Sequence, residues 1–148
     1  MMAMSHESLK VKNQVEVWVY RYEQGRPIFL ILKRMPERGD FWQPITGGIE
    51  PGETPMEAAQ RELFEETGIS SPLYMFDLNC TFCFLWDNRL YTEHVFGVEA
   101  PSEKVILSPE HYDFRWADLE TASALLRWEA NRMMMYQLND LLSTDKNG

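Results

Sequence analysis

Residues 47–69 read GGIEPGETPMEAAQRELFEETGI, and this stretch predicts a helix with a defined start and end. Thr54 can supply an N-cap oxygen and Glu57 can return its carboxylate in a capping box, while the proline between them suits a first helical turn. Gly68 suits the left-handed position that ends a helix. We therefore expect a helix over 55–67.

One face of this helix carries three carboxylates, because Glu62, Glu65 and Glu66 are spaced three and four residues apart. Like charges at this spacing destabilise a helix by about 0.2–0.5 kcal/mol per pair. A bound divalent cation would turn that repulsion into attraction, and hard oxygen ligands suit Mg²⁺ or Mn²⁺. The alternative is an ordinary acidic helix face turned toward water.

The residues around the helix favour the metal site over the ordinary acidic face. Gly47, Gly48 and Gly52 lie immediately upstream, where they let the backbone approach a ligand closely. Glu53 adds a carboxylate at the entrance to the helix, and Arg61 is available to orient one of the acidic side chains. We therefore predict that the segment binds a divalent metal.

The same segment resembles the Nudix box of the Nudix hydrolase family. Gly47, then Glu53, then the run 61–69 (RELFEETGI) occupy every fixed position of that pattern at the expected spacing. The resemblance implies an α/β (α+β) fold in which a mixed β-sheet is sandwiched between helices. It also implies hydrolysis of a diphosphate linkage in a nucleoside diphosphate joined to another group.

The resemblance further implies roles for the acidic residues. Glu62 and Glu66 are the strongest metal ligands, Glu65 joins them or takes the proton from the attacking water, and a carbonyl near Thr46 or Gly47 completes the coordination. Glu53 and Arg61 form either a supporting pair in catalysis or a salt link that pins the loop to the helix. The predicted catalytic set is therefore Glu53, Arg61, Glu62, Glu65, Glu66 and Glu110, with Gly47 as a backbone ligand of the metal.

Glu110 enters this set because Nudix enzymes often place a further carboxylate outside the box. It lies just before the last short strand, in the sequence SPEHYDFRW. Glu93, which has His94 beside it, is the competing candidate, and either glutamate could instead be a solvated surface residue. His111 is more often a loop histidine than a catalytic base.

Candidate substrate-binding residues lie in two other places. Lys33 and Arg34 end the second predicted strand, where they could bind phosphate oxygens or simply be surface charges. Trp42, Trp128 and Asn131 offer the rings and the amide that recognise heterocycles, although either tryptophan could belong to the core.

A softer resemblance, over FWQPITGGIEPGE and scattered C-terminal positions, points to the Nudix branch that acts on nucleoside or pterin triphosphates. It implies a Mg²⁺-dependent pyrophosphohydrolase that releases pyrophosphate and a monophosphate from a dNTP or from dihydroneopterin triphosphate. Dinucleoside polyphosphates or ADP-ribose are the alternative substrates. A non-catalytic, nucleotide-sensing module is the alternative of another class, and it would be expected to have lost metal-binding glutamates that are present here.

Composition limits the remaining possibilities. A chain of 148 residues with 45% apolar content predicts one domain, 1–148, with a frayed tail over 143–148. The net charge of −9 argues against a nucleic-acid partner and against a polybasic membrane surface. The sequence opening lacks a leader pattern, and no apolar run is long enough to span a membrane, so we expect a cytoplasmic protein with a small-molecule partner.

The hydrophobic periodicity predicts a chain in which strands alternate with helices. Met133 and its two methionine neighbours in the last helix suit an irregular core or the seam of a homodimer. Cys80 and Cys83 are predicted to be inert, buried or half-buried thiols on opposite faces of a strand, because no second cysteine pair completes a zinc site. The expected strands are 12–22, 27–34, 73–86, 90–98 and 112–116, and the expected helices are 55–67, 118–126 and 129–142.

Overall fold

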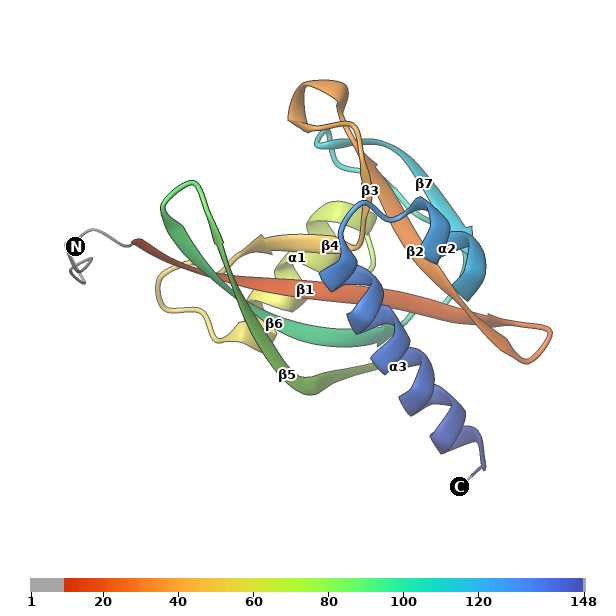
Figure 1. Ribbon diagram of the computed structural model, residues 1–148. Coiled ribbons are helices and arrows are strands. Elements are labelled where there is room, and N and C mark those ends of the chain that lie inside the picture. Colours follow the sequence, from red (N-terminus) through yellow and green to blue (C-terminus); the bar gives the residue numbers. More distant parts are fainter. Residues whose placement is uncertain (1–9, 148) are drawn as a thin grey trace.

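The computed structural model describes the backbone of residues 10–147 and the side chains of residues 10–143. Within this range a mixed sheet lies between helix α1 on one face and helices α2 and α3 on the other (Figure 1). The strands are β1 (Lys10–Glu23), β2 (Arg26–Arg34), β3 (Trp42–Gln43), β4 (Ile45–Gly48), β5 (Tyr74–Trp86), β6 (Arg89–Glu99) and β7 (His111–Ala117). The helices are α1 (Pro55–Thr67), α2 (Leu119–Leu125) and α3 (Glu129–Asn147), with a short 3₁₀ turn, η2 (Pro36–Arg38).

The sheet has the order β3-β2-β1-β6-β5, with β4 paired to β1 and β7 paired to β2. Strands β1 and β6 run parallel, and the other pairs are antiparallel, which confirms the predicted mixed sheet. Strand β2 pairs with β1 only from Tyr20 onward, and nearer the start of β1 the neighbouring strand is β4. The sheet therefore divides there, with β4 beside β1 and β3 beside β2.

Alternation along β1 builds a core on each face of the sheet. Val15, Val17 and Val19 pack into the cluster that contains Ala58, Ala59 and Leu63 of α1. Trp18 and Tyr20 face the other way, into the cluster that contains the buried residues of α2 and α3. Because successive side chains of a strand point to opposite faces, β1 separates an α1 face of the sheet from an α3 face.

Both β-hairpins turn through residues with positive φ. Gln24 and Gly25 have φ of 52° and 78°, and Asp87 and Asn88 have φ of 50° and 58°. Two consecutive left-handed residues match the right-handed twist of the flanking strands, and Asn, Asp and Gly tolerate that conformation best. The hairpin expected around Asp87 is therefore confirmed.

Helix α1 has the bounds and the caps that the sequence predicts. The Glu57 amide donates to Thr54 Oγ1 at 3.1 Å, and the Thr54 amide donates to Glu57 Oε1 at 2.9 Å. Gly68 is left-handed, with φ of 79°, and its amide donates to the carbonyl of Phe64 at 2.8 Å. These caps fix the register of the acidic residues on the helix.

Two parts of the sequence prediction need correction. Helix α3 continues to Asn147, beyond the expected end at 142, and Gly148 lies outside the described residues. Leu142 is buried against the sheet and anchors this last part of the helix. The short strands β3 and β4 were not predicted, because segments this short around Pro44 are too brief to show a period.

The sulfur-containing residues pack mostly as expected. In α3, Met134 and Met135 are buried in the core on the α3 face of the sheet, whereas Met133 is exposed. Cys80 is half-buried and its Sγ lies 3.5 Å from Met134 Sδ, but Cys83 is exposed, which corrects the prediction that both thiols are covered. Among the helices of residues 10–147, none has the length and the apolar content that crossing a membrane requires.

Candidate active site

Arg61 of α1 ties the glycine-rich loop to the helix. Its Nε donates to Glu53 Oε2 at 2.7 Å and its Nη2 donates to Glu53 Oε1 at 3.0 Å, a bidentate pair. The same Nη2 also donates to the carbonyl of Gly48 at 2.8 Å. Hydrogen bonds from Arg61 and from the Glu50 amide lower the pKa of Glu53, so its carboxylate stays charged.

The third nitrogen of Arg61 faces two box carboxylates. Its Nη1 lies 2.9 Å from Glu62 Oε1 and 3.3 Å from Glu65 Oε2. The hydrogen bonds to Glu53, followed by those to Glu62, raise the pKa of Arg61 above its usual range, although burial opposes them. A permanently charged guanidinium therefore sits among the acidic side chains of the loop and the helix.

Glu62 is held against the backbone of β4. It is 8% exposed, and a Cβ added at Gly47 would lie 2.1 Å from Glu62 Cδ. Only glycine at position 47 therefore leaves room for this carboxylate. Burial raises the pKa of Glu62 to about 7; the bonds to Arg61 oppose this rise, and the charges of Glu65 and Glu66 add to it.

Glu66 has a different set of partners, which come from the segment before β7. Ser108 Oγ donates to Glu66 Oε2 at 2.7 Å, and His111 Nδ1 lies 2.8 Å from the same oxygen. Because a carboxylate only accepts, Nδ1–H of His111 is the donor. Gln43 Nε2 lies 3.3 Å from the other ring nitrogen of His111 and fixes the orientation of the ring.

The charge of Glu66 is kept by these contacts. Burial raises its pKa, but the hydrogen bonds from His111 and Ser108 outweigh burial and lower the pKa below its ordinary value. Glu66 is thus a charged carboxylate that is only 3% exposed. A buried charge of this kind needs a cation or strong donors around it.

Glu110 completes the group at the start of β7. The ligand atoms of Glu66, Glu110 and His111 all lie within 4.8 Å of one another. Glu110 also lies 3.7 Å from Arg38 of η2, and its carboxylate is half exposed. The competing candidate Glu93 sits on the α3 face, two residues before the buried Val95, and therefore does not join this group.

The three box carboxylates are divided between two sets of partners. Glu62 and Glu65 contact Arg61, whereas Glu66 contacts His111 and Ser108. The glutamates of this group offer hard carboxylate oxygens, which are the ligand atoms that Mg²⁺ and Mn²⁺ prefer, and His111 offers the only nitrogen among the described candidate ligands. Burial raises the pKa of Glu62, whereas the hydrogen bonds from His111 and Ser108 lower the pKa of Glu66, so the two carboxylates differ in how readily they stay charged.

The predicted phosphate-binding residues separate onto the two faces. Arg34 pairs with His111 in the register of β2 and β7, so the backbone of Arg34 lies beside the group that contains Glu66. Its Nε is buried and has no hydrogen-bond partner among the described residues. Lys33 instead lies over Trp42, with Nζ 5.5 Å from the ring centre, on the α3 face.

The remaining predicted substrate residues lie at the start of α3. Trp128 meets Phe41 and Trp86 edge to face, with ring centres 5.9 and 6.2 Å apart. Asn131 is buried, and its Nδ2 donates to Glu16 Oε1 at 2.7 Å. One of the two N–H groups of the Asn131 amide is therefore engaged with the protein.

The sequence carries no individual signal for Ser108 or Glu16, and it predicts a loop position for His111, which is the first residue of β7. The cluster of polar residues just before a strand, from Ser108 to His111, was the one usable signal.

Comparison with known proteins agrees with this geometry. The model of the NUDIX domain family matches residues 12–138. The chain is 33% identical over 139 residues to the dihydroneopterin triphosphate diphosphatase of Escherichia coli K12. This alignment covers 85% of this chain and 92% of that protein. The structure of the E. coli dihydroneopterin triphosphate pyrophosphohydrolase aligns with a TM-score of 0.73 and 30% identity, covering 86% of this chain and 96% of that one.

A further relative has a different name. The chain is 42% identical over 106 residues to an octanoyltransferase of Myxococcus xanthus, and the match covers 70% of this chain. It covers only 30% of that relative, so the chain spans less than a third of that protein's length. The NUDIX family model and the E. coli relative together confirm the fold and the family expected from the sequence.

Proposed function

Because the chain belongs to the Nudix family of hydrolases, we propose that it is a Mg²⁺-dependent pyrophosphohydrolase of nucleoside or pterin triphosphates. The observation that carries this proposal is the charged, buried Glu66, which is held by Ser108 and His111 next to Glu110. Support for the triphosphate class comes from the relative named for dihydroneopterin triphosphate, which this chain matches over most of both lengths.

The proposed metal ligands are the carboxylates of Glu62, Glu65, Glu66 and Glu110, with the backbone carbonyl of Gly47. When bound there, Mg²⁺ would neutralise phosphate oxygens and lower the pKa of a coordinated water. Arg61 positions Glu62 and Glu65, and His111 with Ser108 keeps Glu66 charged and fixed. Any of the box glutamates near the water can accept its proton.

Arg34 is the proposed phosphate-binding residue on this face. Its buried Nε lacks a partner among the described residues, and a phosphate oxygen would satisfy it. In the reaction, a water oxygen bonds to phosphorus, the bridge between the α- and β-phosphates breaks, and the bridging oxygen leaves with one product. The products are one monophosphate and one pyrophosphate.

Product analysis tests this proposal. The purified chain with Mg²⁺ should convert dNTPs or 7,8-dihydroneopterin triphosphate into pyrophosphate and the monophosphate, as resolved by ³¹P NMR. The panel should also contain diadenosine tetraphosphate, ADP-ribose and a 5′-triphosphorylated RNA, because these would identify the other substrate classes. EDTA should abolish turnover, and excess Mg²⁺ should restore it.

Three outcomes would contradict the proposal. Release of orthophosphate alone would place cleavage at the wrong bond. Turnover only of diadenosine tetraphosphate, of ADP-ribose or of the RNA would assign a different substrate class. Tight binding of a triphosphate without any turnover would indicate a nucleotide-sensing module.

A further inference from the structure

A second acidic pair lies on the α3 face, away from the box. Glu93 of β6 is 5% exposed, and its Oε2 has no hydrogen-bond partner among the described residues. Its neighbour Glu16 of β1 is fully buried, but both of its oxygens are engaged, by Trp18 Nε1 at 2.9 Å and by Asn131 Nδ2 at 2.7 Å. Glu93 thus presents the unsatisfied acceptor, and Glu16 is held in place beside it.

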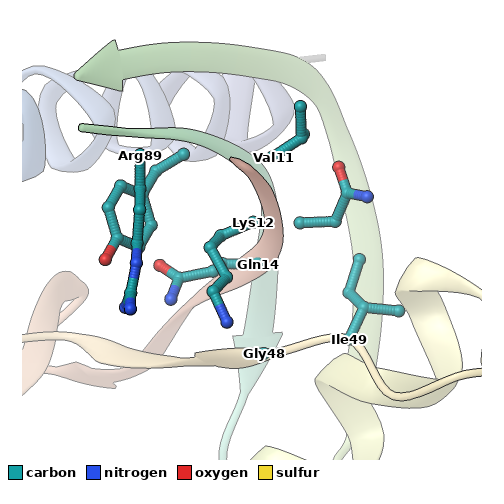
Figure 2. A pocket seen from close by; sticks show the side chains of 8 residues that line it. Val11, Lys12, Gln14, Gly48, Ile49 and Arg89 are labelled. Carbon is teal, nitrogen blue, oxygen red and sulfur yellow. The ribbon is translucent and has the colours of Figure 1, made fainter. Parts of the chain in front are cut away.

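A cavity of about 420 Å³ lies where β1, β4 and β6 meet, and it is lined by neighbours of Glu93 rather than by Glu93 itself. Its lining includes Gln14, which is the register partner of Glu93, and Tyr91, which precedes Glu93 by two residues on the same face of β6. Figure 2 shows Arg89, Lys12 and Gln14 together on one side of β1.

The lining of this cavity also reaches the box. It contains Gly48, whose carbonyl accepts a hydrogen bond from Arg61. A substrate in the cavity would therefore reach from the glycine-rich loop to Gln14 and Tyr91, the neighbours of Glu93. The cations Lys12 and Arg89 in the same lining suit an anionic ligand.

The chemistry of Glu93 restricts what can lie against it. A carboxylate only accepts hydrogen bonds, so a ligand that satisfies it must bring N–H or O–H donors. Burial raises the pKa of Glu93 to about 7, and a pair of donors would stabilise its charged form. The Tyr91 ring stacks on Phe84 with centres 4.9 Å apart and planes 8° apart, which adds an aromatic wall suited to a flat heterocycle.

We propose that Glu93 recognises the 2-amino-4-oxopyrimidine edge that guanine and pterin rings share, so that the substrates are guanine or pterin nucleotides and their analogues. This edge presents a ring N–H and an exocyclic NH₂ side by side, both donors. Adenine and cytosine present an acceptor next to their amino group, and that acceptor would face the carboxylate. The inference rests on the proposed function, because it names the substrate class of the same enzyme.

Direct binding tests this inference without relying on turnover. Neopterin can be titrated by its own fluorescence, and guanosine and adenosine by calorimetry, all without metal. Wild-type protein should bind neopterin and guanosine at least about tenfold more tightly than adenosine. Glu93→Gln replaces one acceptor with an NH₂ donor and should remove that preference, while Glu120→Gln, an exposed change on α2, should keep it.

The outcomes separate the two proposals. Equal binding of guanosine and adenosine by the wild type would overturn the inference, and this outcome does not depend on whether Glu93→Gln folds. A Glu93→Gln protein that melts normally and keeps the preference would overturn it as well. A clear preference in a chain that hydrolyses no triphosphate would support the role of Glu93 and would refute the proposed reaction instead.

Discussion

Replacing Glu66 with Gln is expected to lower kcat by about a thousandfold or more while leaving the fold intact. The change removes the one box carboxylate that the protein keeps charged while it is buried. Gln is nearly isosteric, and its amide oxygen can still accept from Ser108 and His111. The structure should therefore survive, whereas a metal ligand and its negative charge are lost.

Steady-state kinetics with the best substrate of the panel and a thermal melt measure the two parts of this prediction. Glu120→Gln is the control for losing a carboxylate, because that residue lies exposed on α2, away from both sites. A Glu66→Gln protein that turns over substrate at near-normal rate would show that Glu66 is not part of the catalytic group. An unfolded variant would show that the residue is needed for folding, in which case Glu66→Asp replaces it in the kinetic test.

The second large effect is expected from adding a single methyl group at Gly47. In Gly47→Ala the new Cβ would lie 2.1 Å from Glu62 Cδ and 2.6 Å from Glu62 Cγ, so the carboxylate must move away from β4. Misplacing a catalytic group by about 1 Å can cost about a hundredfold in rate. We expect kcat/KM to fall by roughly that factor, together with weaker Mn²⁺ binding in a titration followed by electron paramagnetic resonance.

Gly48→Ala is the matched control for this prediction, because a Cβ at position 48 would meet nothing within 4 Å. It adds the same methyl group one residue along the same strand, and the carbonyl that accepts from Arg61 remains. Its Mn²⁺ affinity should equal that of the wild type. Equal losses in both variants would contradict the steric account and would point to a general sensitivity of β4.

The sequence was most informative where the signals were local. Each cap of α1 is a contact between residues close in sequence, Thr54 with Glu57 and Gly68 with Phe64, so the caps defined the bounds of the helix correctly. The period of two located β1, a continuous apolar run located β2, and the turn signal at Asp87 located the pair β5 and β6. The acidic group of the box could be predicted for the same reason, since its members lie on one helix.

The contacts that complete the site are not local and could not be predicted. Glu66 meets Ser108 and His111 from 42 and 45 residues away, through the placement of β7. The contact of Arg61 with Glu65 follows the i,i+4 spacing of a helix, whereas the partners of Glu66 come from outside the helix. Glu93 was considered as an additional ligand of the metal, yet the pleat of β6 turns it to the opposite face.

Anomalous diffraction at the manganese edge tests the central claim most directly, using crystals of the chain with Mn²⁺ and a non-hydrolysable triphosphate analogue. The account predicts anomalous peaks between the analogue's phosphates and the carboxylates of Glu62 and Glu66, at the distances of oxygen coordination. Phosphates bound elsewhere, with Glu62 still paired to Arg61 and no manganese at Glu66, would contradict it.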